Sequence, residues 1–163
     1  MTTAPNPYAS DLGTRDPLQA LADTPARIRS AVRDWTPARF ERTYASGKWS
    51  IRRVLIHLAQ TELALGTRVR FALTQRDYAA QSFSQDEWLP LDETLDAAAA
   101  LEVYSALRRM NVAMFRALPA SAFGREFTHP EYGVLTVGWV AAQMAGHDLH
   151  HLKQITAAGV AGT

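Results

Sequence analysis

TVGWVAAQMAGHDLHHLKQI, residues 136–155, is the stretch of sequence that indicates the fold most clearly. Its apolar residues recur at intervals of three and four, the period of an amphipathic helix. His147 and His151 continue this apolar stripe one turn apart, at positions where core side chains are expected. Because side chains at i and i+4 lie on one helix face, these two imidazoles can hold one metal ion. His150 lies off the stripe and is predicted to face solvent.

The composition is that of an ordinary globular protein, and 163 residues suffice for one domain with a sizeable core. The net charge of +1 gives no electrostatic indication of a nucleic-acid or membrane partner. The absence of cysteine excludes disulfides, thiolate zinc sites and a cysteine nucleophile. We expect residues 1–16 to form a flexible N-terminal arm and residues 17–163 to form a single domain.

The first ten residues, MTTAPNPYAS, lack the basic and apolar regions of a signal peptide. The sequence also lacks a run of 18 apolar residues that would span a membrane. These two features predict a cytoplasmic location.

Three further segments have helical periodicity. Thr24-Pro25 matches an N-cap followed by a proline at the first helical position, which predicts a helix from Pro25 to about Asp34. Ser50 is a plausible N-cap for a long helix over 51–75. A third long helix is expected from about Thr94 to Leu118, with a core face that we list as Ala100, Val103, Leu107, Met110, Met114 and Leu118. Four such segments predict an all-α helical bundle.

Two irregular connections separate the helices. Residues 76–93 are too many for a tight helical hairpin, so they can cross the bundle and let the second and third helices run in the same direction. Residues 119–135 contain a turn at 130–133; a short extended pair can form around this turn, but no sheet is predicted there.

A divalent metal site needs a third protein ligand. His57 is the best candidate because it lies in mid-helix beside an apolar stripe, where an unpaired imidazole requires a partner. His129, in a loop before a proline, is the alternative. In the competing interpretation, all of these histidines are core residues satisfied by hydrogen bonds. A zinc-peptidase HExxH motif is absent because Asp148, and not glutamate, follows His147.

The acidic residues near these histidines give weak candidates for a general base. Glu62 falls on the apolar stripe of its helix, and we expect it to be paired with an arginine. Asp148 can orient an imidazole, although a solvated carboxylate is the favoured interpretation. Glu62, Asp148 and His150 are the three weak catalytic candidates.

Two motifs resemble the DinB/YfiT-like superfamily. The segment GKWSIRRVLIHLAQTE at 47–62 is similar to its second-helix motif, and THPEYGVLTVGWVAAQMAGHDLHHLKQI at 128–155 is similar to its last-helix motif, with an HPxxG turn and an HDxxH run. The resemblance implies a four-helix bundle in up-down-down-up order. It also implies one divalent metal ion, either nickel, zinc or iron, held by His57, His147 and His151.

The same resemblance implies a metal-dependent enzyme acting on a small molecule, such as an S-transferase that uses a low-molecular-weight thiol like bacillithiol or mycothiol, or a hydrolase. A non-catalytic, stress-related bundle that binds a metal or ligand is the alternative. No DNA binding is expected, because the arginines are scattered among acids. Family members often form homodimers, and Leu149 and Leu152, off the main stripe, are candidate contacts with a partner.

Overall fold

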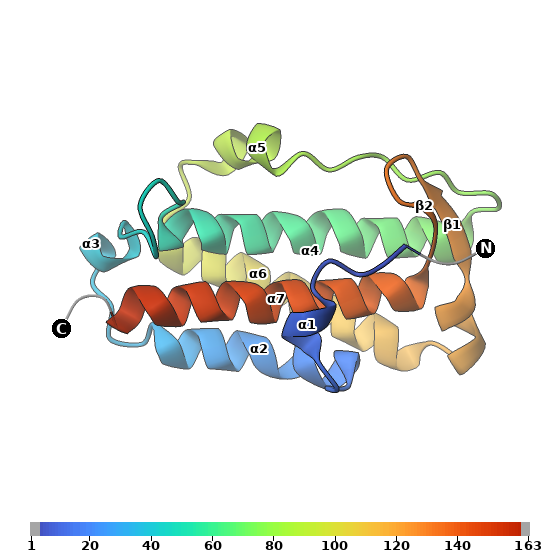
Figure 1. Ribbon diagram of the computed structural model, residues 1–163, viewed down its shortest axis with the longest axis horizontal. Helices are drawn as coiled ribbons and strands as arrows, with labels where there is room; N and C mark the ends of the chain where they lie inside the picture. Colours follow the sequence, from blue (N-terminus) through green and yellow to red (C-terminus); the bar gives the residue numbers. More distant parts are fainter. Residues whose placement is uncertain (1–3, 161–163) are drawn as a thin grey trace.

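Four long helices lie side by side along the long axis of the molecule (Figure 1). The computed structural model describes residues 4–160, and its long helices are α2 (Pro17–Ala31), α4 (Ile51–Thr74), α6 (Ala97–Ala117) and α7 (Val137–Val160). The predicted all-α four-helix bundle is therefore confirmed. Within residues 4–160, no helix combines the length and the apolar character needed to cross a membrane.

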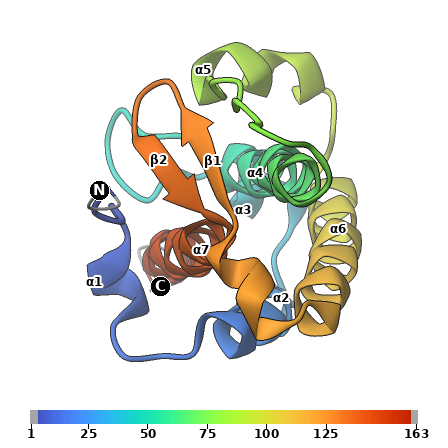
Figure 2. The ribbon, with the colours of Figure 1, turned by 90° about the vertical axis from the view of Figure 1, so that its right-hand side faces the viewer.

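The helices run in up-down-down-up order, as the family resemblance implied. α2 and α7 run in one direction, and α4 and α6 run in the other (Figure 1). The most extensive packing joins α4 to α6 and α2 to α7, so each of these pairs is parallel. Viewed along the bundle, the four helices form a square with α4 and α7 adjacent to each other (Figure 2). This adjacency brings the two proposed metal-binding helices together.

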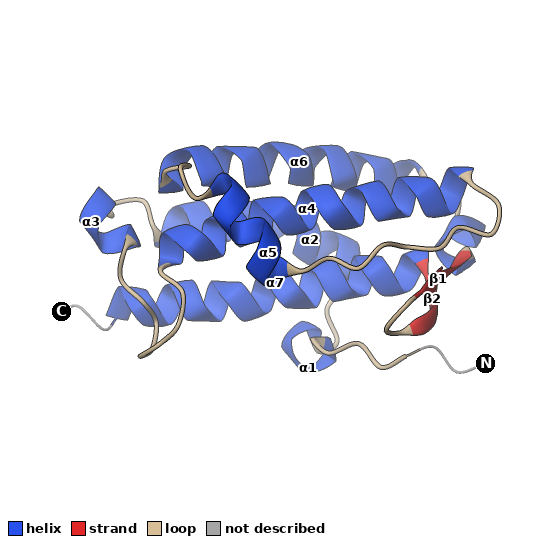
Figure 3. Ribbon diagram, turned by 90° about the horizontal axis from the view of Figure 1, so that it is seen from above, coloured by secondary structure: helices blue, strands red, loops and turns tan. Residues whose placement is uncertain are grey.

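The parallel pairing of α4 and α6 depends on a connection that returns along the bundle (Figure 3). This connection contains the short helices α5 (Gln85–Trp88) and η1 (Leu89–Asp92). The Gln60 side chain on α4 holds it by donating to the Trp88 carbonyl at 2.8 Å and to Asp92 Oδ2 at 2.7 Å. The predicted crossing connection is therefore present, and these two hydrogen bonds attach it to α4.

The second connection differs from the prediction, because part of it is a β-hairpin. After η2 (Ala120–Gly124), strands β1 (Glu126–His129) and β2 (Gly133–Thr136) pair antiparallel, with Phe127 opposite Leu135. Both of these side chains are buried. Gly133 supplies the positive φ of 69° that begins the second strand. Burial of this apolar pair explains the short sheet that local sequence did not predict.

The predicted start of the first long helix at Pro25 was wrong. α2 begins at Pro17, where Asp16 Oδ1 accepts the backbone N–H of Gln19 at 2.7 Å, and Pro25 lies inside the helix. A proline at this position cannot donate to the carbonyl of Leu21. Arg108 from α6 donates to that carbonyl instead, at 3.1 Å. The helix therefore passes through Pro25 without leaving a buried acceptor unpaired.

The predicted core face of α6 was also partly wrong. The helix is capped by Asp96 and not by Thr94, and Val103 and Met110 are 41% and 52% exposed. Arg108 and Asn111 are instead buried. The periodicity of apolar residues did not reveal this face of α6, because the residues buried at its centre, Arg108 and Asn111, are polar.

The N-terminal segment packs along α7 from Ala4 onward. Its short helix α1 (Ala9–Leu12) contacts α7, and Trp139 Nε1 on α7 donates to the Ala4 carbonyl at 2.8 Å. The flexible arm expected over residues 1–16 thus has a docked position over most of its length, and residues 1–3 lie outside the described residues. Another short helix, α3 (Pro37–Phe40), follows α2.

The apolar core has two parts, one toward each end of the bundle, and the proposed metal site lies between them. Leu149 packs in one part and Leu152 in the other, and they are only 4% and 7% exposed. Both leucines line a cavity beside α1 and α2, and little of either side chain is exposed for contact with a partner.

Candidate metal centre

Three imidazoles meet between α4 and α7. His57 comes from α4, and His147 and His151 come from successive turns of α7. His147 Nε2 lies 2.9 Å from His57 Nε2 and 3.0 Å from His151 Nε2. All three side chains are buried, at 3–7% exposed. The predicted convergence of His57 with the pair on the last helix is thus present, whereas His129 is not a member of the cluster.

Hydrogen bonding among the three rings does not satisfy their nitrogen atoms. His147 Nε2 has two nitrogen neighbours, but one ring nitrogen carries either a single proton or a single lone pair. It can therefore form a good hydrogen bond with only one of them. A metal ion accepts a lone pair from each nitrogen, and two ligands each at about 2.1 Å from one ion are themselves about 3.0–3.4 Å apart. The two Nε2–Nε2 distances from His147, 2.9 and 3.0 Å, lie close to the lower end of this range, and the ligand atoms of all three histidines lie within 4.8 Å of one another.

A chain of hydrogen bonds fixes the tautomer of His151. Gln154 Oε1 lies 2.6 Å from His151 Nδ1, and because an amide oxygen only accepts, Nδ1 carries the proton. The lone pair of His151 Nε2 is thereby directed at the cluster. Gln154 Nε2 donates to His150 Nε2 at 3.0 Å, and His150 Nδ1 lies 3.3 Å from Asp11 Oδ2. α1 therefore supports a proposed ligand through two intervening side chains.

Burial favours the neutral imidazoles that metal binding requires. Desolvation, together with the neighbouring His147, lowers the pKa of His57 to about 3, although the Asp148 carboxylate opposes this shift. Desolvation and the same neighbour lower the pKa of His151 well below its ordinary value. At neutral pH both rings are thus uncharged and present lone pairs to a cation.

Aromatic rings from three segments surround the cluster. Tyr8 lies edge-on to His147 with ring centroids 5.1 Å apart, and Trp49 lies edge-on to His57 at 5.3 Å. Phe83, from the crossing connection, is parallel to His57 at 6.2 Å. These rings limit water around the nitrogens, which strengthens electrostatic interactions at the centre.

Two cavities adjoin the three histidines. The first, of about 180 Å³, is lined by His57 and His147 together with Tyr8, Thr61, Leu65, Arg68, Phe83, Gln85, His129, Glu131, Tyr132 and Gln143. The second, of about 350 Å³, is lined by His151 together with Tyr8, Tyr44, Gly47, Lys48, Trp49, Gln85, Asp86, His150 and Gln154. Tyr8 and Gln85 line both cavities, so the proposed metal centre can be approached from two sides.

Beneath the imidazoles lies a buried charge network centred on Arg108. This arginine donates to Asp148 Oδ2 at 2.6 Å, and it also pairs with Glu62. Asn111 donates to Glu62 Oε2 at 2.9 Å, and the Tyr104 hydroxyl donates to Asp148. The predicted pairing of Glu62 with an arginine is therefore present, whereas the favoured interpretation of Asp148 as solvated was wrong.

This network bears on the three weak catalytic candidates. Burial alone would raise the pKa of the Asp148 carboxyl, but Arg108 and His147 together outweigh that effect and hold the pKa below its ordinary value. Neither Asp148 nor Glu62 lines the two cavities at the histidines. Asp148 Oδ1 lies 3.8 Å from His147 Nδ1, so it acts on that imidazole through charge. His150 lines the larger cavity, with 42% of its side chain exposed, as predicted for a residue off the stripe.

Sequence reasoning missed several residues around the centre. Gln154 could have been found, because it follows His151 by three positions and thus lies on a neighbouring part of the same helix face. Tyr8, Arg68 and Phe83 gave no local signal, since only the tertiary fold brings their segments to α7 or to the cavity.

Comparison with known proteins supports this architecture. The family model described as the DinB superfamily matches residues 20–155. A protein of Oceanobacillus iheyensis, named a putative metal-dependent hydrolase, is 29% identical over 140 residues, covering 85% of this chain and 81% of that protein. Bacillus subtilis YfiT, which carries the same functional name, is 28% identical over 142 residues, covering 85% and 80%.

A solved structure of Bacillus subtilis YfiT superposes with a TM-score of 0.80 at 28% identity, covering 86% of this chain and 82% of that one. It is described as a probable metal-dependent hydrolase with an unusual four-helix bundle topology.

Proposed function

The chain belongs to the DinB superfamily, and on this premise we propose that it is an enzyme that depends on one divalent metal ion. The ligands are His57, His147 and His151. The observation that carries the proposal is the meeting of three buried Nε2 atoms beside two cavities, with His147 Nε2 within 3.0 Å of the other two.

Three neutral imidazoles leave the charge of a divalent ion uncompensated and leave coordination positions for other ligands. When bound, such an ion polarises a substrate oxygen and lowers the pKa of a coordinated water or thiol. Nickel, zinc and iron all suit imidazole ligands.

We assign thiol transfer as the reaction that this geometry supports best. A transferase brings two substrates together, and the two cavities that share Tyr8 and Gln85 offer a place for each. The chain has no cysteine, so the thiol comes from a small molecule. Lys48 in the larger cavity and Arg68 in the smaller one can bind anionic groups of these two substrates.

Hydrolysis is the second candidate, and the names of the relatives favour it. The Glu131 carboxylate lines the cavity at His57 and His147. It is the acidic residue there that can accept a proton from an attacking water.

One experiment separates these possibilities. Protein loaded in turn with zinc, nickel and ferrous iron is incubated with monochlorobimane and a low-molecular-weight thiol, and separately with p-nitrophenyl acetate without thiol. We expect metal-dependent formation of the bimane thioether, and we expect its loss in His57→Ala and His151→Ala. Cleavage of the ester without formation of the thioether would identify the protein as a hydrolase. Equal rates of these reactions in metal-loaded and metal-free protein would refute the proposal that the enzyme depends on a metal ion.

Metal analysis provides the matched control. His150→Ala removes an imidazole that supports His151 only through Gln154 and is not a proposed ligand, so this variant is expected to retain one metal ion per chain. If His151→Ala retained one metal ion per chain, the assignment of His151 as a metal ligand would be contradicted.

A further inference from the structure

A second cavity system lies on the other side of the bundle, between α2 and α6. It is a groove of about 550 Å³ and shares no lining residue with the two cavities at the histidines. We propose that this groove binds a small amphipathic anion, namely an organic molecule that joins a phosphate or carboxylate group to a short apolar chain. The inference is independent of the proposed metal chemistry.

The charge of the groove is the first observation. Five arginines line it without any acidic residue: Arg29, Arg33, Arg108, Arg109 and Arg116. The chain as a whole has a net charge of only +1, so this groove concentrates positive charge. Guanidinium groups bind phosphate and carboxylate oxygens in a bidentate manner, and they do so more strongly where water is partly excluded.

The exposed arginines of the groove are not neutralised by the protein. Across residues 4–160, none of Arg29, Arg33, Arg109 and Arg116 forms a salt bridge with a carboxylate. Arg29 Nη2 donates only to the neutral Ser105 hydroxyl, at 3.2 Å. Their positive charge is therefore available to a ligand.

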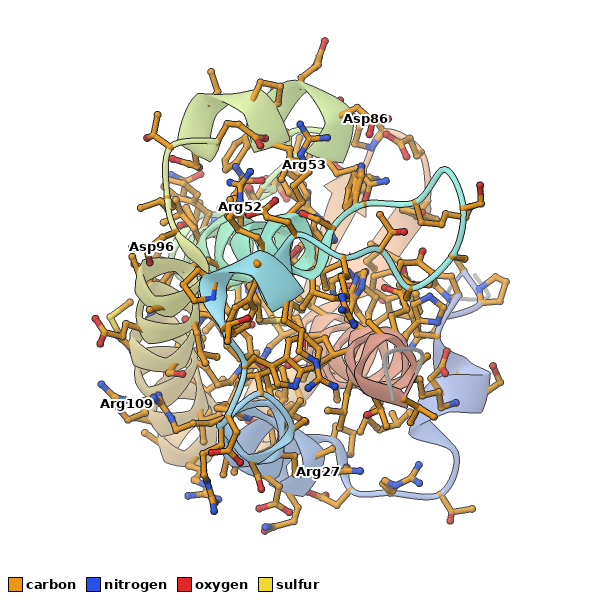
Figure 4. All side chains as sticks on the ribbon, turned by 90° about the vertical axis from the view of Figure 1, so that its left-hand side faces the viewer. Arg27, Arg52, Arg53, Asp86, Asp96 and Arg109 are labelled. Atoms are coloured by element: carbon orange, nitrogen blue, oxygen red, sulfur yellow. The ribbon has the colours of Figure 1, made fainter. Side chains whose placement is uncertain are left out.

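Their placement gives the groove two charged rims. Arg29 lies on α2 and Arg33 lies in the turn just beyond the last residue of that helix, Ala31, whereas Arg109 and Arg116 are seven residues apart along one face of α6. In Figure 4, Arg109 lies on the side of α6 near α2, whereas Arg27 projects from α2 toward another side. Arg27 correspondingly lines a different cavity, beside α7.

The remaining groove lining consists mainly of small and apolar residues: Ala22, Pro25, Ala26, Val112 and Ala113, with the hydroxyls of Ser30 and Ser105. Small side chains leave room for the apolar part of a ligand, which gains free energy on leaving water. This lining distinguishes the groove from a purely polar surface for inorganic ions.

Arg108 supplies an independent indication of a polar ligand. It lines the groove although it is only 1% exposed, and its Nη atoms are taken by Asp148, Glu62 and the Leu21 carbonyl. Its Nε is buried and has no hydrogen-bond partner among the described residues. A buried N–H without an acceptor is costly, and an anion in the groove can provide that acceptor after a small adjustment of the side chain.

The test is a calorimetric titration of the full chain with octyl phosphate below its micellar concentration. Octanol is the probe that lacks the charge, and inorganic phosphate is the probe that lacks the alkyl group. We expect octyl phosphate to bind at least tenfold more tightly than either probe, and we expect added salt to weaken binding. Equal affinities for octyl phosphate and octanol would overturn the proposal.

Substitutions locate the site. The double variant Arg33→Gln/Arg109→Gln removes one charge from each rim at exposed positions, and it is expected to weaken binding by tenfold or more. The matched control, Arg27→Gln, removes an exposed arginine of α2 outside the groove and is expected to bind within twofold of wild type. Binding by the double variant within twofold of wild type would refute the groove as the site.

Vesicles separate a free molecule from a lipid headgroup as the source of the anion. Vesicles of phosphatidylcholine containing phosphatidic acid present the same phosphate at a membrane surface. We expect octyl phosphate to compete with these vesicles for any binding that they show. Vesicle binding by wild type without measurable binding of octyl phosphate would overturn the small-molecule proposal.

Discussion

Gln154 hydrogen-bonds to the proposed metal ligand that lies one turn before it on the last helix, His151. Its amide oxygen accepts from His151 Nδ1 at 2.6 Å, and its amide nitrogen donates to His150. The side chain therefore selects the tautomer of one ligand and holds its ring in place.

The variant Gln154→Leu is expected to weaken metal binding by about 10–100-fold, because the His151 N–H loses its acceptor and the ring can rotate or change tautomer. Competition with a chromogenic chelator measures the dissociation constant. Gln19→Leu, at an exposed glutamine of α2, is the control and should leave the constant unchanged. An unchanged dissociation constant in Gln154→Leu would show that Gln154 does not set the tautomer of His151.

Arg108 of α6 contacts each of the other three long helices. It belongs to α6, pairs with Glu62 of α4 and Asp148 of α7, and donates to the Leu21 carbonyl of α2. Its removal would leave two carboxylates buried without their cation and one carbonyl without a donor.

We expect Arg108→Met to lower the free energy of unfolding by about 3–5 kcal/mol, the range for breaking a buried ion pair from one side. Urea denaturation of the metal-free protein measures the change. The neighbouring exposed residue provides the comparison, since Arg109→Met should change stability by less than about 0.5 kcal/mol. Similar losses in the two variants would mean that the buried network contributes little.

Among the elements, long apolar stripes predicted the existence of the four helices, but tertiary contacts set several of their details. α2 continues through Pro25 because Arg108 satisfies the carbonyl that the proline leaves unpaired. α6 turns Arg108 and Asn111 inward because acids on other helices pair with them, directly or by hydrogen bonds. Helical periodicity of apolar residues contains no information about such partners.

The N-terminal segment and α7 approach each other closely at Gly146. A methyl group placed on this glycine would lie 2.4 Å from the Tyr8 carbonyl oxygen and 2.7 Å from Tyr8 Cβ. Glycine therefore allows Tyr8 to reach the ring of His147.

Gly146→Ala is expected to displace the segment around Tyr8 from α7 at a cost of about 1–3 kcal/mol, the usual range for overpacking. Faster tryptic cleavage after Arg15, which directly follows α1 and Gly13–Thr14, would report this displacement. The control is Gly124→Ala, because a methyl group there meets no atom within 4 Å. Equal cleavage rates in both variants would contradict tight docking of the segment.

At the scale of the whole molecule, the meeting of His57 with His147 and His151 could not follow from sequence spacing. His57 is 90 residues from His147, and only the up-down-down-up order places α4 beside α7. The resemblance to the DinB/YfiT-like superfamily supplied that order, whereas helical spacing supplied only the pair on α7. The cavities and the arginine groove required the assembled structure.

Metal removal is expected to destabilise the whole bundle, because an ion bound only by the folded chain stabilises it by about 2.7 kcal/mol at a free concentration of 100 times its dissociation constant. For a domain of this size, that free energy corresponds to a fall in Tm of about 5–10 °C on adding chelator. Differential scanning calorimetry measures the fall. His151→Ala should abolish it and His150→Ala should preserve it, and a chelator effect of equal size in both would argue against the assigned ligands.

The separation of the proposed ligands along the chain has a consequence for local opening. An ion held by His57 and the α7 pair would be a cross-link that closes a loop of about 90 residues. In its presence, α7 could not leave α4 without breaking coordination bonds, so the amide hydrogens of both helices should exchange with solvent deuterium only on global unfolding. Without it, α7 and the N-terminal segment that packs on it would be free to open as a unit and take up deuterium before α6 does.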